Sequence, residues 1–324
     1  MAEPDRNRLE AMPCNVMEEI LKNINYVEIQ RLRKVSSSMR KLVDFTLFDT
    51  KIRILYIFLG HGKIDMHFTF SEKEKVKISY VDVNDGCEVS DVSGRLGRHF
   101  FANTTSASLV RKDFKTLKSV FINQPSPVEV LEITFREHGL NAYHDTIALS
   151  LTSPPHLRVK ILSLRYGNGN RPSAMSVLPY VCPDTLEHLQ IDAYDRQHLL
   201  NADAIFELSH SKRLQVFHAK TLRITDPMCI VHIPMSHIRL NMITLEQVKR
   251  LIQAFRNFEA FEFCEIRLDN INDRLEILNA ITPDVPYWFP FELNFRSSRP
   301  GWLLKMTYPD HGIIFRTILE TDLS

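Results

Sequence analysis

The stretch that decides the fold is residues 12–45, MPCNVMEEILKNINYVEIQRLRKVSSSMRKLVDF. Between Val16 and Ile24, apolar residues recur every three or four positions, which places them on one face of a helix. A second short helical segment follows at residues 27–35, and the serines at 36–38 supply a break and a cap for a third helix. Because helices this short are unstable alone, they are expected to pack on one another or on a partner.

Beyond residue 50 the apolar period changes from that of a helix to that of a strand. Residues 50–84 contain three runs of alternating apolar positions separated by glycine or charged turns, which is typical of an antiparallel meander. The segment that follows, up to Thr105, is rich in turn residues and predicts a loop.

A different rhythm begins near residue 107, where short apolar pairs recur 23 to 31 residues apart. These pairs are Leu131/Ile133, Leu162/Leu164, Leu189/Ile191, Leu214/Val216, Ile238/Leu240 and Phe261/Phe263. Residues 245–258 have the apolar spacing of a helix, and a closing β-meander is expected after Pro290. Strand–helix units at this spacing are typical of leucine-rich-repeat solenoids, and an α/β domain with evenly spaced strands is the alternative. Either arrangement gives a largely parallel sheet.

The expected fold class is therefore α+β or α/β. A small N-terminal three-helix domain would be followed by a leucine-rich-repeat-like strand–helix domain that ends in a β-meander.

Composition excludes several classes of protein. Forty basic and thirty-nine acidic residues leave a formal charge of +1, so the basic footprint of a nucleic-acid-binding protein is missing. No apolar run is long enough to span a membrane, and the charged first residues do not form a signal peptide, so we expect an intracellular protein of the cytoplasm, the nucleus or both. The five cysteines form no CxxC pair and are interpreted as buried thiols.

Enzyme motifs are missing from the sequence. It contains no HExxH, no GxSxG, no Walker loop and no GxGxxG after a strand. The glycines at 60 and 62 are better explained by a hairpin turn than by a phosphate loop. We therefore predict no catalytic residue, no metal site and no cofactor.

The first stretch resembles the F-box. The matching positions are Met12-Pro13, Ile20-Leu21, Leu32-Arg33, Val35-Ser36 and Met39-Arg40. In the family these places hold Leu-Pro, Ile-Leu, Leu-Arg, Val-Ser and Trp-Arg. Methionine replaces the leading leucine and the tryptophan here, and both changes keep an apolar side chain.

The remainder resembles the FTH domain of the nematode F-box A family. The matching pieces are Asn84-Asp85-Gly86-Cys87, Asp113-Phe114-Lys115, Val177-Leu178-Pro179-Tyr180, Thr185-Leu186-Glu187 and Ile243-Thr244-Leu245-Glu246. The resemblance implies an F-box at 8–48, a β-rich connecting segment at 50–105 and a target-binding FTH domain at 107–320.

The F-box resemblance implies that the chain binds the Skp1 adaptor, and through it a cullin, in a ubiquitin ligase whose catalysis lies in other subunits. It assigns Skp1 contacts to Pro13, Val16, Ile20, Leu21, Leu32, Val35 and Leu42. Periodicity does not separate partner-facing positions from the core of the module.

The second domain would hold an unknown target protein on the strands of residues 160–265. Candidate contacts, taken as solvent-facing, are Arg165, Tyr166, His188, Gln190, His218 and Arg239. A substrate-recognition adaptor is the leading hypothesis. A non-degradative adaptor that uses the F-box only as a tether, and an enzyme with an unrecognised site, are the alternatives.

Overall fold

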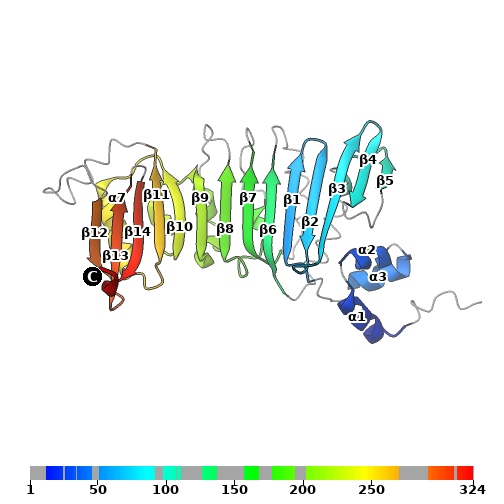
Figure 1. Ribbon diagram of the computed structural model, residues 1–324, viewed down its shortest axis with the longest axis horizontal. Coiled ribbons are helices and arrows are strands. Elements are labelled where there is room, and N and C mark those ends of the chain that lie inside the picture. Colours follow the sequence, from blue (N-terminus) through cyan, green and yellow to red (C-terminus); the bar gives the residue numbers. More distant parts are fainter. Residues whose placement is uncertain are drawn as a thin grey trace, which may run out of the picture. The chain divides into compact units, whose positions relative to one another are not determined.

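The computed structural model describes residues 12–24, 26–33, 35–45, 51–91, 98–106, 108–110, 126–136, 157–167, 177–193, 202–269, 291–309 and 312–323 (Figure 1). It divides into two compact units. The first comprises residues 1–160 and 176–185, and the second comprises residues 161–175 and 186–324.

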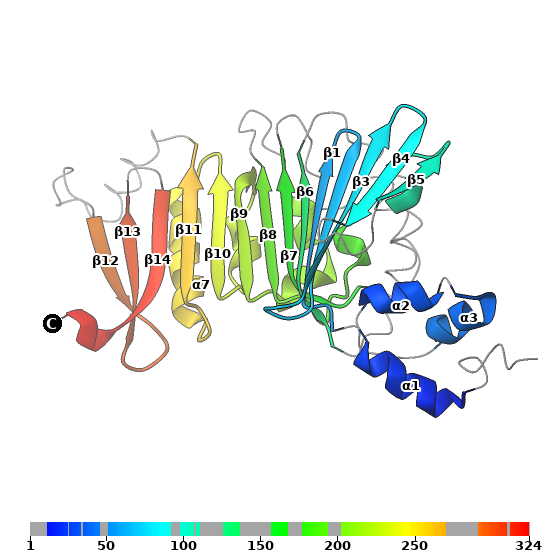
Figure 2. The same ribbon diagram turned by 45° about the vertical axis from the view of Figure 1, so that its right-hand side comes forward.

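Three short helices occupy the predicted module in the first unit (Figure 2). They are α1 (Cys14–Asn23), α2 (Tyr26–Arg33) and α3 (Ser37–Phe45). Ser36 caps α3 as the sequence predicted, because its hydroxyl oxygen accepts a 3.0 Å hydrogen bond from the Met39 N–H. Leu21, Ile29 and Val43, one from each helix, form a buried cluster.

Six strands form the sheet of the first unit. They are β1 (Ile54–Gly60), β2 (Lys63–Thr69), β3 (Lys75–Val83), β4 (Gly86–Asp91), β5 (Arg98–Ala102) and β6 (Val128–Phe135). β1 to β5 form consecutive antiparallel pairs, so the predicted meander is confirmed. β1 also pairs in parallel with β6, with Ile57 opposite Ile133. The prediction of a loop up to Thr105 is wrong, because β4 and β5 lie within that segment.

Eight strands form the sheet of the second unit. In spatial order they are β12 (Phe291–Arg296), β13 (Trp302–Tyr308), β14 (Gly312–Leu319), β11 (Phe263–Leu268), β10 (Met235–Leu240), β9 (Val216–Arg223), β8 (His188–Ala193) and β7 (Val159–Tyr166). The pairs from β7 to β11 are parallel. β12, β13 and β14 form the predicted closing meander, and β14 pairs antiparallel with β11.

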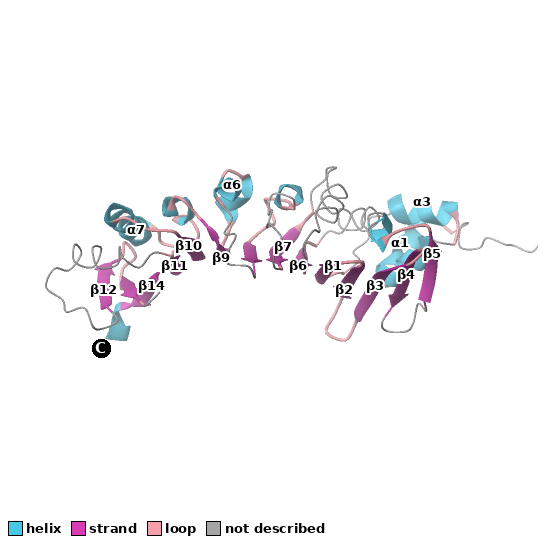
Figure 3. Ribbon diagram, turned by 90° about the horizontal axis from the view of Figure 1, so that it is seen from above, coloured by secondary structure: helices cyan, strands magenta, loops and turns pink. Residues whose placement is uncertain are grey.

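Helices cover one face of the second unit's sheet (Figure 3). They are α6 (Asp203–Phe206), α7 (Leu245–Asn257) and the 3₁₀ turns η3 (Ser209–Arg213) and η4 (Pro227–Ile230). α7 confirms the predicted helix, and its capping box joins Thr244 to Gln247. The Phe255 ring lies 4.1 Å from that of Phe261 and 5.2 Å from that of Phe315. These ring contacts attach α7 to the face of the sheet that the helices cover.

The predicted fold class, α+β or α/β with a leucine-rich-repeat-like strand–helix domain, is wrong, because the described residues are mostly mixed β-sheet with few helices. The described residues contain fourteen strands in mixed parallel and antiparallel pairing but five α-helices, of which α7 alone exceeds ten residues. In the connection from β9 to β10, Pro227 and Pro234 leave room for the short turn η4 and no full helix. The apolar pairs are evenly spaced because the chain comes back to the sheet at regular intervals. The connection from β9 to β10 makes this return without an α-helix.

Candidate functional site

The three-helix module exposes apolar side chains beside its own core. Met12, Val16 and Val35 are 36%, 41% and 67% exposed, whereas Leu21 and Ile29 are fully buried. Water-exposed apolar side chains on a small module are typical of a surface that a partner covers.

The structure sorts the seven predicted Skp1 contacts into three groups. Pro13, Val16 and Val35 are exposed. Ile20 and Leu42 are half-buried, and Leu32 is partly buried against the core cluster. Leu21 belongs to that cluster, so its side chain holds the helices together.

A second surface follows from strand alternation in the second unit. Along β8 to β11, buried residues alternate with less buried ones. The buried side chains, which are apolar except for Ser236, point to the helix-covered face, and the less buried ones, most of them polar, point to the opposite face. We call this opposite surface the polar face. It comprises His188, Gln190, Asp192, His218, Lys220, Arg223, His237, Arg239, Glu265 and Arg267, together with Asp269 directly after β11.

Glu265 organises one part of the polar face. Its carboxylate accepts contacts from Lys220 Nζ at 2.9 Å, His237 Nδ1 at 2.9 Å and Arg267 Nε at 3.0 Å. The His237 ring also lies 4.9 Å from the ring of His218. Side chains from three neighbouring strands thus meet at one carboxylate.

Asp269 organises a second part in the same manner. It pairs with Arg223 Nε at 3.1 Å and with Arg239. Asp192 accepts a 2.6 Å hydrogen bond from Gln190 Nε2 and lies 3.8 Å from His218 Nε2. The polar face therefore carries two carboxylates, Glu265 and Asp269, that each hold at least two basic side chains.

The environment shifts the pKa of two groups on this face. Burial disfavours the charged form of Glu265, but hydrogen bonds from Lys220, His237 and Arg267 outweigh it and lower the pKa of Glu265 to about 2. Burial lowers the pKa of His218; the nearby Asp192 carboxylate opposes this, and His237 and Lys220 add to it.

The lowered pKa of Glu265 predicts acid sensitivity of the second unit. A carboxylate with a lower pKa in the folded state stabilises the fold above its ordinary pKa, and that contribution is lost as the pH falls toward the folded value. We expect the unfolding midpoint in urea to decrease between pH about 4.5 and about 2. The decrease should be smaller in Glu265→Gln, and an equal decrease in both proteins would contradict the assignment.

The six predicted target contacts divide in the structure. His188, Gln190, His218 and Arg239 lie on the polar face, and Arg165 on β7 is half-buried. Tyr166 is fully buried, so its expected exposure is wrong. It alternates with Arg165 and points to the other side of the strand.

Sequence reasoning missed seven members of the polar face. They are Asp192, Lys220, Arg223, His237, Glu265, Arg267 and Asp269. Their signal was present in β11, where Glu265 and Arg267 alternate with the buried Cys264 and Ile266.

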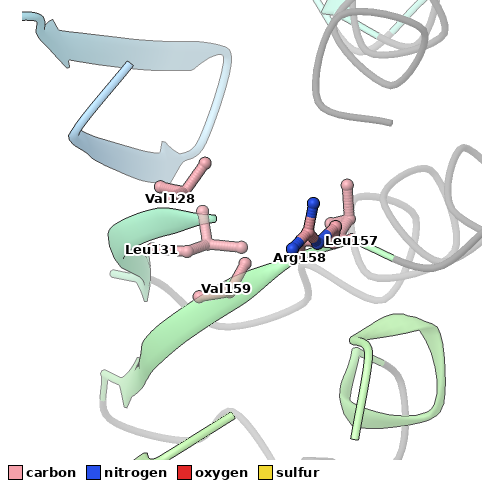
Figure 4. Close-up of a pocket in the computed structure, with 5 residues that line it drawn as sticks. All are labelled: Val128, Leu131, Leu157, Arg158 and Val159. Carbon is pink, nitrogen blue, oxygen red and sulfur yellow. The ribbon is translucent and has the colours of Figure 1, made fainter. Parts of the chain in front are cut away.

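Within the described ranges, no group of three or more His, Cys, Asp or Glu residues has the arrangement of a metal site. Figure 4 shows a small pocket in the first unit, lined by Val128, Leu131, Leu157, Arg158 and Val159. Its lining is apolar except for Arg158 and contains no carboxylate, imidazole, thiol or hydroxyl. This lining supplies no nucleophile or acid–base pair. No helix in the described ranges is both long and apolar enough to cross a membrane.

Comparison with known proteins agrees with the two domain resemblances. The family model for the F-box domain matches residues 9–51, and that for the FTH domain matches residues 142–284. F-box A protein 224 of Caenorhabditis elegans is 22% identical over 294 residues, which are 87% of this chain and 72% of that relative. No solved structure matches the chain significantly. F-box and FTH domains are typical of non-catalytic adaptor proteins. The chain therefore contains regions that match the F-box and FTH domain models, as its sequence motifs predicted.

Proposed function

We propose that this protein is a substrate-recognition adaptor of an SCF-type cullin-RING ubiquitin ligase. In this proposal residues 8–48 bind Skp1 and through it a cullin, residues 107–320 hold a target protein, and residues 50–105 connect the two. The protein acts inside the cell, in the cytoplasm, the nucleus or both, and has no catalytic step of its own.

The observation that carries the proposal is the exposure of apolar side chains within the matched F-box. Val16 and Val35 face water although Leu21, Ile29 and Val43 of the same module are buried. F-box domains generally bind Skp1 within such ligases. Exposed apolar anchors on a small helical module suit an interface in which a few side chains carry most of the binding energy.

The test is binding of Skp1 to the full chain and to a Val16→Asp/Val35→Asp variant. We expect the variant to bind at least about tenfold more weakly, because each aspartate would have to be desolvated at an apolar interface. Both side chains are exposed, so circular dichroism should show an unchanged fold. Isothermal titration calorimetry measures the affinity.

Met242→Asp is the control, because Met242 is 50% exposed in the second unit and the substitution also places an aspartate at an exposed apolar position, outside the F-box. It should bind Skp1 as the parent chain does. If the parent chain is folded and does not bind Skp1, the ligase assignment is wrong. Ligase function further requires that the lifetime of a bound target lengthens when the protein is removed; an unchanged lifetime favours the tethering role.

A further inference from the structure

The polar face carries more cationic groups than carboxylates can neutralise. Lys220 and Arg267 both pair with Glu265, and Arg223 and Arg239 both pair with Asp269. Four cations therefore share Glu265 and Asp269. With Asp192 counted, the polar face holds four cations and three carboxylates, an excess of one positive charge with the histidines neutral.

Two of the arginine side chains are more exposed to solvent than the carboxylates with which they pair. The side chains of Glu265 and Asp269 are 19% and 14% exposed, whereas those of Arg223 and Arg267 are 45% and 46% exposed. Solvent therefore meets guanidinium groups more readily than the carboxylates that hold them. Both arginines use Nε in these ion pairs, and a guanidinium carries four further N–H donors.

Strand register aligns these arginines. Arg239 lies opposite Arg223 on β9 and opposite Arg267 on β11. Neighbouring strands are about 4.8 Å apart, so the three residues form a short row across the parallel strands. The shared carboxylates limit the freedom of the side chains, which lowers the entropy lost when they bind a ligand.

We propose that this arginine row binds a carboxylate-rich segment of the target protein, an inference that rests on the proposed function. Arginine suits this role because its planar fork forms paired hydrogen bonds with carboxylates. The row is built on strands, so it offers fixed donors to an acidic segment lying across β9 to β11.

The experiment uses the full chain bound to Skp1 and a fluorescein-labelled glutamate–serine peptide as the probe, read by fluorescence anisotropy. The same peptide with glutamine in place of glutamate is the neutral control. We expect the acidic peptide to bind more tightly than the neutral one, and its affinity to fall as salt is added. Equal binding of the two peptides overturns the proposal.

Arg223→Gln/Arg267→Gln should weaken binding of the acidic peptide about tenfold, since each exposed charge pair contributes up to about 1 kcal/mol. Lys249→Gln/Arg250→Gln is the matched control: it removes the same charge from the exposed side of α7 and should change the affinity less than about twofold. Equal losses in the two variants would show a general charge effect and overturn the proposal. Melting curves confirm that both variants are folded.

Three further outcomes distinguish the chemistry of the bound segment from the proposed ligase function. A phosphoserine peptide of equal length that binds, while the glutamate peptide does not, overturns the carboxylate proposal. Skp1 binding without binding of the acidic peptide overturns this inference and leaves the proposed function standing. If the chain alone binds the acidic peptide but no Skp1, the ligase assignment fails and the chemistry assigned to the arginine row is supported.

Discussion

Phe255→Ala is expected to destabilise the second unit by about 3 to 5 kcal/mol, the usual range for removing a buried phenylalanine. The Phe255 side chain is fully buried, and its ring contacts Phe261 and Phe315. Removing it leaves a cavity between α7 and the sheet that the surrounding strands cannot fill without moving. Urea unfolding followed by tryptophan fluorescence measures the effect, because Trp288 and Trp302, the chain's two tryptophans, both belong to residues 186–324.

Gln253→Ala on the exposed side of the same helix is the matched control and should change stability by less than about 0.5 kcal/mol. A loss below about 1 kcal/mol for Phe255→Ala would show that α7 contributes little to holding the unit together.

Gly312→Ala is expected to destabilise the junction of β11 and β14 by about 3 kcal/mol, at the upper end for inserting atoms into a packed site. A Cβ atom at Gly312 would lie 2.0 Å from the Ile266 carbonyl oxygen. Because the obstacle is backbone, the two strands must separate, and the closing meander would lose its pairing with β11.

Gly301→Ala provides the comparison for Gly312→Ala. Its added Cβ meets nothing within 4 Å, but its φ of +75° disfavours alanine, so a smaller cost of about 1 kcal/mol is expected. The same fluorescence measurement applies to both variants. If Gly301→Ala is the more damaging, the close approach of β14 to β11 is not what limits stability.

Local signals predicted the elements that the structure confirms. The helix at 245–258 could be predicted from its apolar stripe, because helical spacing is a signal contained within a few turns of the sequence. β5 was missed because every one of its five residues is exposed, so its sequence lacks the alternation that marks a strand.

The candidate site was predicted only in part because its contacts join distant residues. Arg223 and Asp269 are 46 positions apart, and only the register of β9, β10 and β11 brings them together. The apolar spacing also could not show that Val16 and Val35 are exposed, because the same spacing includes both these residues and the buried residues of the module's core.

The parallel pairing of β1 with β6 has a consequence for synthesis of the protein. Ile57 has no parallel partner until the ribosome adds Ile133, 76 residues later. At roughly 5 to 20 residues per second, that edge of β1 stays without its partner strand for about 4 to 15 seconds. The antiparallel hairpins from β1 to β5 can close during this interval, since their contacts are local. An apolar strand edge is thus presented to chaperones and to other nascent chains before the native sheet can cover it.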